Sequence, residues 1–269
     1  MEHIKKWRLK LTTVSVIVTN FHQEKYLKEC LESIENQTFA DYDVLVIDDN
    51  EEGQSNLAHS RNNLIWTFDI GLSACRMKGV ERTSSKYLLF LDADDKLHPQ
   101  FLAKTVKVLE DNPKYSVCFT DTQHFDGANT YWEQPEYNFY SLLQNNFMCS
   151  CSLIKRNDFL ACGGFDLDNF NYWEDYENWI NMGSKGYYGK HLPEKLFYYR
   201  MHKESGTQSK RNEFLSPYYK AYIISKHFEL YPREWEPQVK QILSQYPLDF
   251  MKWKPKEQEQ YLKEKGFIT

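Results

Sequence analysis

Short apolar runs alternate with amphipathic stretches through residues 13–120. The runs are rich in branched and aromatic residues and nearly free of charge, which is typical of strands buried on both faces of a parallel sheet. The pattern predicts strands at 13–19, 43–50, 64–68, 87–91 and 115–120, and helices at 23–36, 72–81 and 99–112. Strand, helix and strand in this order form βαβ units. We therefore expect an α/β fold with a mostly parallel central sheet flanked by helices.

The alternation ends after Asp121. Residues 122–172 mix short strand-like pieces with aromatic loops, and a helix over 174–184 and a strand over 196–200 follow. Residues 212–269 have a helical, amphipathic pattern. Within them, residues 218–228 combine aromatic and cationic side chains, which suits either a helix packed across a domain or a helix lying on a membrane surface. We favour packing, because no long polybasic cluster accompanies these residues.

Two of the predicted strands end in carboxylates. Asp48 and Asp49 end one, and Asp92, Asp94 and Asp95 directly follow another. Open α/β sheets bind ligands at the carboxyl ends of their strands. Carboxylates this close together repel one another unless a cation lies between them, and Mg²⁺ or Mn²⁺ would bridge them to a phosphate-bearing substrate. The alternative is that Asp94 or Asp95 caps the helix that begins near Pro99.

Composition narrows the class of protein. With 269 residues, 41% of them hydrophobic and 26% charged, the chain can bury a sizeable core. Its net charge of −5 gives no reason to expect a nucleic-acid partner. The six cysteines show no paired spacing for zinc, so we expect reduced thiols. No signal-peptide core and no membrane-spanning run is present, which predicts a location in the cytoplasm or, through peripheral contact, at the inner membrane surface.

Eight short motifs, taken in order, resemble the inverting glycosyltransferases of the GT-A fold in the large class called family two. The motifs are VSVIVT (14–19), QTF (37–39), VIDD (46–49), GLSACR (71–76), FLDADD (90–95), GGFD (163–166), WEDYE (173–177) and YRMH (199–202). The resemblance implies a GT-A, Rossmann-like domain over 13–209 after a lead-in over 1–12. Residues 13–121 would bind the nucleotide sugar, 122–209 the acceptor, and 210–269 would form a C-terminal helical appendage.

The resemblance also implies where the sugar donor binds. It assigns the nucleotide-sugar site to Thr19, Phe21, Asp49, Arg76, Asp92, Ala93 and Arg200. Phe21 stands where the family usually has tyrosine, so ring stacking is kept and the hydroxyl is lost. Met77 follows Arg76 where asparagine is common. A guanidinium at Arg76 suits the oxygens of a diphosphate.

The same resemblance assigns the metal, the base and the acceptor side. Asp94 would bind Mn²⁺ or Mg²⁺, with His202 completing the metal sphere or contacting the diphosphate. Asp175 would be the general base, because a carboxylate with an ordinary pKa near 4 is ionised at neutral pH. Trp173 and Glu174 would contact the acceptor sugar. The plainer interpretation is that the acids at 174–177 only favour a helix N-terminus, and that His202 and Trp173 only pack.

The expected activity is metal-dependent transfer of a sugar, with inversion, from a UDP-sugar or another nucleotide sugar to a saccharide or glycan hydroxyl. One alternative is a sugar-phosphate nucleotidyltransferase, although residues 20–24 lack the glycine-rich loop that such enzymes use for triphosphate. Another is a non-catalytic sugar-binding domain of the same fold. The sugar, the acceptor and the oligomeric state are left open.

Overall fold

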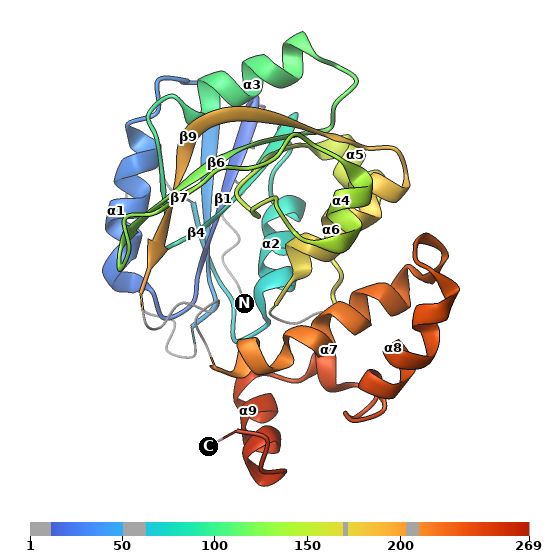
Figure 1. Ribbon diagram of the computed structural model, residues 1–269. Helices are drawn as coiled ribbons and strands as arrows, with labels where there is room; N and C mark the ends of the chain where they lie inside the picture. Colours follow the sequence, from blue (N-terminus) through green and yellow to red (C-terminus); the bar gives the residue numbers. More distant parts are fainter. Residues whose placement is uncertain (1–11, 51–62, 169–171, 203–209, 269) are drawn as a thin grey trace.

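The computed structural model describes residues 12–50, 63–168, 172–202 and 210–268. Its centre is one mixed sheet in the order β3-β2-β1-β4-β8-β6-β9-β5, with β7 paired to β6 (Figure 1). The strands are β1 (Val14–Asn20), β2 (Tyr42–Asp48), β3 (Asn63–Trp66), β4 (Tyr87–Asp92), β5 (Lys96–Leu97), β6 (Val117–Asp126), β7 (Tyr131–Trp132), β8 (Leu153–Lys155) and β9 (Gly189–Met201).

Helices cover both faces of this sheet and continue beyond it at the C-terminal end (Figure 1). The α-helices are α1 (Glu24–Glu35), α2 (Leu72–Glu81), α3 (Phe101–Asp111), α4 (Phe139–Gln144), α5 (Arg156–Ala161), α6 (Glu174–Ser184), α7 (Lys210–Lys226), α8 (Glu236–Leu243) and α9 (Pro255–Glu264). Short 3₁₀ turns are η2 (Phe228–Leu230), η3 (Arg233–Trp235) and η4 (Phe250–Lys252).

Successive side chains of β1 point to opposite faces of the sheet, and a separate buried cluster covers each face. Val14, Val16 and Val18 pack into one buried cluster with residues of α1 and α3. Ile17 points to the other face and joins a cluster with α2 and α6. Gly79 lets α2 approach the strand closely, because a Cβ there would lie 2.4 Å from Ile17 Cγ2. Both faces of β1 are thus buried, as the uncharged run predicts.

Strand directions confirm the mostly parallel sheet. β1 pairs in parallel with β2 and β4, β2 with β3, and β6 with β9. The short strand β8 runs antiparallel between β4 and β6, which leaves those two long strands parallel to each other. The carboxyl ends of β1, β2 and β4 therefore meet at one edge, where a ligand site is expected.

Two local expectations need correction. Asp95 does not cap the following helix: β5 intervenes, α3 begins at Phe101, and its N-cap is Gln100. The strands predicted at 115–120 and 196–200 are parts of the longer β6 and β9. The sequence pattern did not predict their long parallel pairing, because polar residues interrupt the apolar runs of both strands.

The C-terminal residues pack on the sheet domain and on one another. Leu215, Tyr218 and Tyr219 of α7 are buried together with Phe250 and Leu262. This burial favours packing for the aromatic and cationic stretch at 218–228, while peripheral membrane contact stays a prediction. Among the described helices, none is both long and apolar enough to cross a bilayer.

Candidate active site

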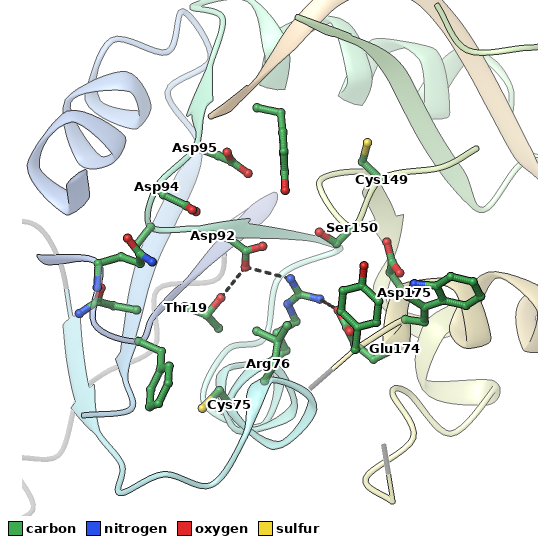
Figure 2. Close-up of a pocket in the computed structure, with 18 of the residues that line it drawn as sticks. Thr19, Cys75, Arg76, Asp92, Asp94, Asp95, Cys149, Ser150, Glu174 and Asp175 are labelled. Atoms are coloured by element: carbon green, nitrogen blue, oxygen red, sulfur yellow. Dashed lines mark hydrogen bonds and ion pairs between the residues drawn. The ribbon is translucent and has the colours of Figure 1, made fainter. Parts of the chain in front are cut away.

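A cavity of about 590 Å³ opens at the edge where β1, β2 and β4 end. It is also lined by the first residues of α2 and α6 and by parts of β6, β7 and β9. Among the predicted site residues, those that line it are Thr19, Phe21, Asp49, Arg76, Asp92, Ala93, Asp94, Trp173, Glu174 and Asp175. Arg200 and His202 do not belong to the lining. Figure 2 shows Asp94 and Asp95 on one side of Arg76 and Asp175 on the other.

Arg76 ties three elements together at the centre of this cavity. Its Nη1 donates to Glu174 Oε1, and its Nη2 donates to Asp92 Oδ1 at 2.9 Å. Thr19 Oγ1 donates to the same Asp92 oxygen at 2.8 Å (Figure 2). Burial opposes the charge of Arg76, but Asp92 and Glu174 outweigh it and raise the pKa of Arg76 above its ordinary value. Both terminal nitrogens of the guanidinium are thus already bonded to protein carboxylates, and Glu174 is bonded to Arg76.

The segment around Arg76 is packed from the opposite side by the GGFD motif. The Arg76 guanidinium carbon lies 5.5 Å from the centre of the Phe165 ring. Gly164 has a φ of 76°, and a Cβ there would lie 2.6 Å from Met77 Sδ. Met77 therefore packs against the GGFD motif.

Asp175 lies in the first turn of α6. The N-cap of this helix is Trp173, which has a left-handed conformation with a φ of 63°. Tyr176 N donates to Asp175 Oδ1 at 2.7 Å, and Asn146 Nδ2 lies 3.5 Å from both carboxylate oxygens. Burial, with the negative charge of Glu174, raises the pKa of Asp175 to about 7, although Arg76 opposes the shift. This corrects the expected ordinary pKa near 4.

Asp94 and His202 face each other, with 2.9 Å between Asp94 Oδ2 and His202 Nε2. A carboxylate and an imidazole are ligands that suit Mn²⁺, and Mg²⁺ also takes carboxylate oxygen. Among the described residues, no group of three or more His, Cys, Asp or Glu side chains forms a full metal cage. Such an incomplete set fits a cation that completes its sphere with waters and substrate phosphates.

The side chain of Arg200 bonds to other protein groups and does not line the cavity. Its guanidinium bonds to Glu29, to Asp126 and, through Nε at 2.7 Å, to the carbonyl of Asp94. The guanidinium carbon lies 4.3 Å from the Tyr26 ring centre and 4.4 Å from that of Phe125. Its backbone N–H donates to Asp95 Oδ1 at 2.8 Å. In place of the expected nucleotide contact, this geometry makes Arg200 a support for the Asp92–Asp95 turn.

Asp49 holds the loop before α2. Its Oδ1 accepts from Thr67 Oγ1 at 2.7 Å and from Ile70 N at 3.0 Å, and its Oδ2 accepts from Gly71 N at 3.0 Å. Gly71 is the N-cap of α2 and has a φ of 88°, which favours glycine.

Sequence reasoning missed several lining residues, namely Asp69, Trp132, Asn146, Cys149 and Pro255. Trp132 belongs to a strand of only two residues, and Pro255 begins a helix far from the motifs. The only available signal was the aromatic content of 122–172, which marked that stretch as irregular without placing any residue.

Comparisons with known proteins agree with this architecture. The sequence profile described as Glycosyl transferase family 2 matches residues 15–169. The putative glycosyltransferase EpsH of Bacillus subtilis (strain 168) is 27% identical over 150 residues, which is 50% of this chain and 44% of EpsH. The chain therefore matches less than half the length of that relative.

Two solved structures share the fold. S. aureus TarS 1-349 in complex with UDP matches with a TM-score of 0.60 and 17% identity, covering 93% of this chain and 78% of that one. The mannosyltransferase PcManGT from Pyrobaculum calidifontis, in complex with GDP-Man and Mn²⁺, matches with a TM-score of 0.60 and 16% identity, covering 88% and 72%. These matches confirm the expected GT-A fold class. Since the profile covers more than half of the sequence, the chain belongs to glycosyl transferase family 2.

Proposed function

We propose that this protein is an inverting glycosyltransferase. It would move a sugar from a nucleotide-diphosphate donor, with a UDP-sugar as the first candidate, to a hydroxyl of a saccharide or glycan acceptor. Residues 13–121 would bind the donor and 122–209 the acceptor. The observation that carries the proposal is that Asp94 and Asp175, far apart in the sequence, line the same cavity on either side of the Arg76 ion pairs.

The position of Asp175 supports its role as general base. The residue lines the cavity, and a pKa of about 7 matches a base that works near neutral pH. The acceptor oxygen would form a bond to the anomeric carbon while its proton passes to an Asp175 oxygen. The bond from that carbon to the diphosphate oxygen would break, and its electron pair would leave with the nucleoside diphosphate. Attack from the side opposite the leaving group inverts the configuration.

Asp94 and His202 would hold a divalent cation, Mn²⁺ or Mg²⁺. When bound, such a cation would neutralise the negative charge that grows on the departing diphosphate. Arg200 would keep Asp94 in position through the hydrogen bond from its Nε to the Asp94 carbonyl. Mn²⁺ accompanies GDP-Man in the PcManGT structure, and UDP is bound in the TarS structure. Both facts support a nucleotide-sugar donor and a divalent ion for this chain.

The test is a screen of nucleotide sugars with oligosaccharide acceptors, with and without Mn²⁺ and Mg²⁺. We expect metal-dependent release of nucleoside diphosphate, and proton NMR of the product should show inverted anomeric configuration. Retained configuration would contradict the proposed mechanism. Release of pyrophosphate from a nucleoside triphosphate and a sugar phosphate would identify a nucleotidyltransferase. Binding of nucleotide sugars without turnover by any acceptor would identify a binding domain.

A further inference from the structure

The C-terminal residues supply part of the cavity wall. Pro255, the first residue of α9, lines the cavity together with Asp69, Gly71 and Leu72. Figure 1 shows α9 beyond α7, extending away from the sheet. The family profile ends at residue 169, so this piece of wall lies outside the matched region. The C-terminal segment is therefore part of the site and not only an attachment to it.

An ion pair joins this segment to the loop that precedes α2. Lys254 Nζ lies 2.5 Å from Asp69 Oδ2, although the two residues are 185 positions apart in the sequence. The Lys254 side chain is 43% exposed, whereas that of Asp69 is only 13% exposed. Asp69 has a φ of 49°, a left-handed conformation that is uncommon for residues other than glycine but more frequent for Asp and Asn. The pair thus lies at the rim of the cavity, with the carboxylate on the inner side.

Lys254 is also held from its own side. Its backbone N–H donates to Glu257 Oε2 at 2.8 Å in the capping box that begins α9. The neighbouring Trp253 ring packs 5.4 Å from Phe250 and 5.7 Å from Tyr261, centre to centre. The backbone that carries the Lys254 side chain is therefore fixed at the start of α9.

The loop at 67–71 therefore has contacts on two sides. Asp49 accepts three hydrogen bonds from Thr67, Ile70 and Gly71 on the inner side. Lys254 holds Asp69 on the outer side. Phe21, Asp49 and Gly71 line the same cavity as Asp69, and the proposed function places the nucleoside of the donor beside Phe21 and Asp49, so the loop would border that region.

We propose that Lys254, acting through Asp69, is a positioning residue of the donor site: it holds the 67–71 loop in the conformation that binds the nucleotide, with Pro255 completing the wall. The inference rests on the proposed function, because it names a residue that tunes the same donor site. An isolated exposed ion pair contributes little to folding stability. Loss of the pair should therefore appear in nucleotide affinity and not in the melting temperature.

The experiment compares Lys254→Met, Asp69→Asn and the double variant with the wild type. Asparagine tolerates the left-handed conformation at position 69. The matched control is Lys252→Met, which breaks the exposed pair of Lys252 with Asp168, 3.0 Å apart and outside the cavity lining. Lys254→Arg keeps the positive charge and should keep the affinity. Calorimetric titration with UDP and with GDP, both in the presence of Mn²⁺, gives the dissociation constants.

We expect Lys254→Met and Asp69→Asn each to weaken binding of the preferred nucleotide by about five- to tenfold, and the double variant to bind no worse than the weaker single variant, because coupled residues are not additive. Lys252→Met and Lys254→Arg should bind like the wild type, and the melting temperatures of all these variants should match that of the wild type. Wild-type affinity in Lys254→Met, or a double variant whose loss is the product of the two single losses, would overturn the inference. A wild type that binds neither UDP nor GDP would contradict the donor assignment of the proposed function. Nucleotide binding that is equal in Lys254→Met and the wild type would overturn the inference alone.

Discussion

The two sides of the cavity are built in different ways. One side, which we call the strand-end wall, consists of polar residues that end a strand or start the next helix: Thr19, Asp49, Arg76, Asp92 and Asp94. Each of these side chains is hydrogen-bonded to another protein group. The geometry of this wall is therefore set before any ligand arrives.

The other side, which we call the aromatic wall, is formed by residues from distant segments: Trp132, Tyr172, Trp173 and Tyr199. Trp132 is 39% exposed, and Tyr172 packs against Tyr219 of α7 with 5.0 Å between ring centres. Ring faces accept sugars of different shape with few fixed polar contacts. Under the proposed function, the strand-end wall would hold the donor and the cation, and the aromatic wall would contact the acceptor.

Asp175 lines the same cavity, and its removal should have the largest effect. Asp175→Asn keeps the shape of the side chain but cannot take a proton, so kcat should fall by about 10²- to 10⁴-fold. The affinity for UDP, measured by calorimetry, should stay unchanged. Asp158→Asn is the control, because it removes a carboxylate from the first turn of another helix, α5, outside the cavity lining. Equal turnover in Asp175→Asn and wild type would remove Asp175 from the mechanism.

The pH dependence of activity in the wild type and in Asp175→Asn gives a second test of the base. The base must be ionised, so kcat/KM of the wild type should rise with pH and level off above an apparent pKa of about 7. The residual activity of Asp175→Asn should lack that inflection. The folded state raises this pKa and so favours the protonated form, which means that the stability contributed by Asp175 is present at acid pH and lost as pH rises through about 7. A profile already flat from pH 5 upward would show an ordinary carboxylate.

Arg76 tests whether the strand-end wall depends on its buried charges. Arg76→Met should lower the free energy of unfolding by about 3–5 kcal/mol, because Asp92 and the buried Glu174 would lose their partner. Urea unfolding measures the loss. Lys86→Met is the control, since Lys86 and Glu110 form an exposed pair and should contribute no more than about 1 kcal/mol. Similar losses in both variants would show that the central ion pairs are not structurally important.

A substitution in the aromatic wall should have the smallest effect, and it should change the KM for the acceptor only. Trp132→Ala should raise the KM for the acceptor by about three- to tenfold, the size expected for one aromatic contact. The KM for the donor should not change. Tyr140→Ala removes an aromatic ring that is 79% exposed and outside the cavity lining, so it should leave both values unchanged. A larger change in the donor KM than in the acceptor KM would reverse the assignment of the two walls.

The same difference explains what the sequence could predict. The strand-end wall follows from local patterns: buried runs place Asp49, Asp92 and Asp94 at one edge, because parallel strands end together. The start of α6 at Glu174 was also predictable from its apolar spacing.

Features that depend on distant contacts could not be predicted. Asp69 and Lys254 are joined across 185 positions, and no periodicity links them. The raised pKa of Asp175 depends on burial by other segments of the chain. The ion pairs of Arg200 with Glu29 and Asp126 depend on where β9 lies relative to α1 and β6. The resemblance assigned Arg200 to the nucleotide from its sequence neighbours, which do not reveal the ion pairs that Arg200 forms in the folded protein.

The central claim is that Asp94, His202 and Asp175 act on one donor in one cavity. Crystals of the Asp175→Asn variant grown with UDP and Mn²⁺ test it directly, because anomalous diffraction at the manganese edge locates the ion. We predict one peak in contact with Asp94 Oδ2 and His202 Nε2, with the diphosphate in the cavity that residue 175 lines. A manganese peak away from Asp94, or a diphosphate bound outside this cavity, would contradict the account.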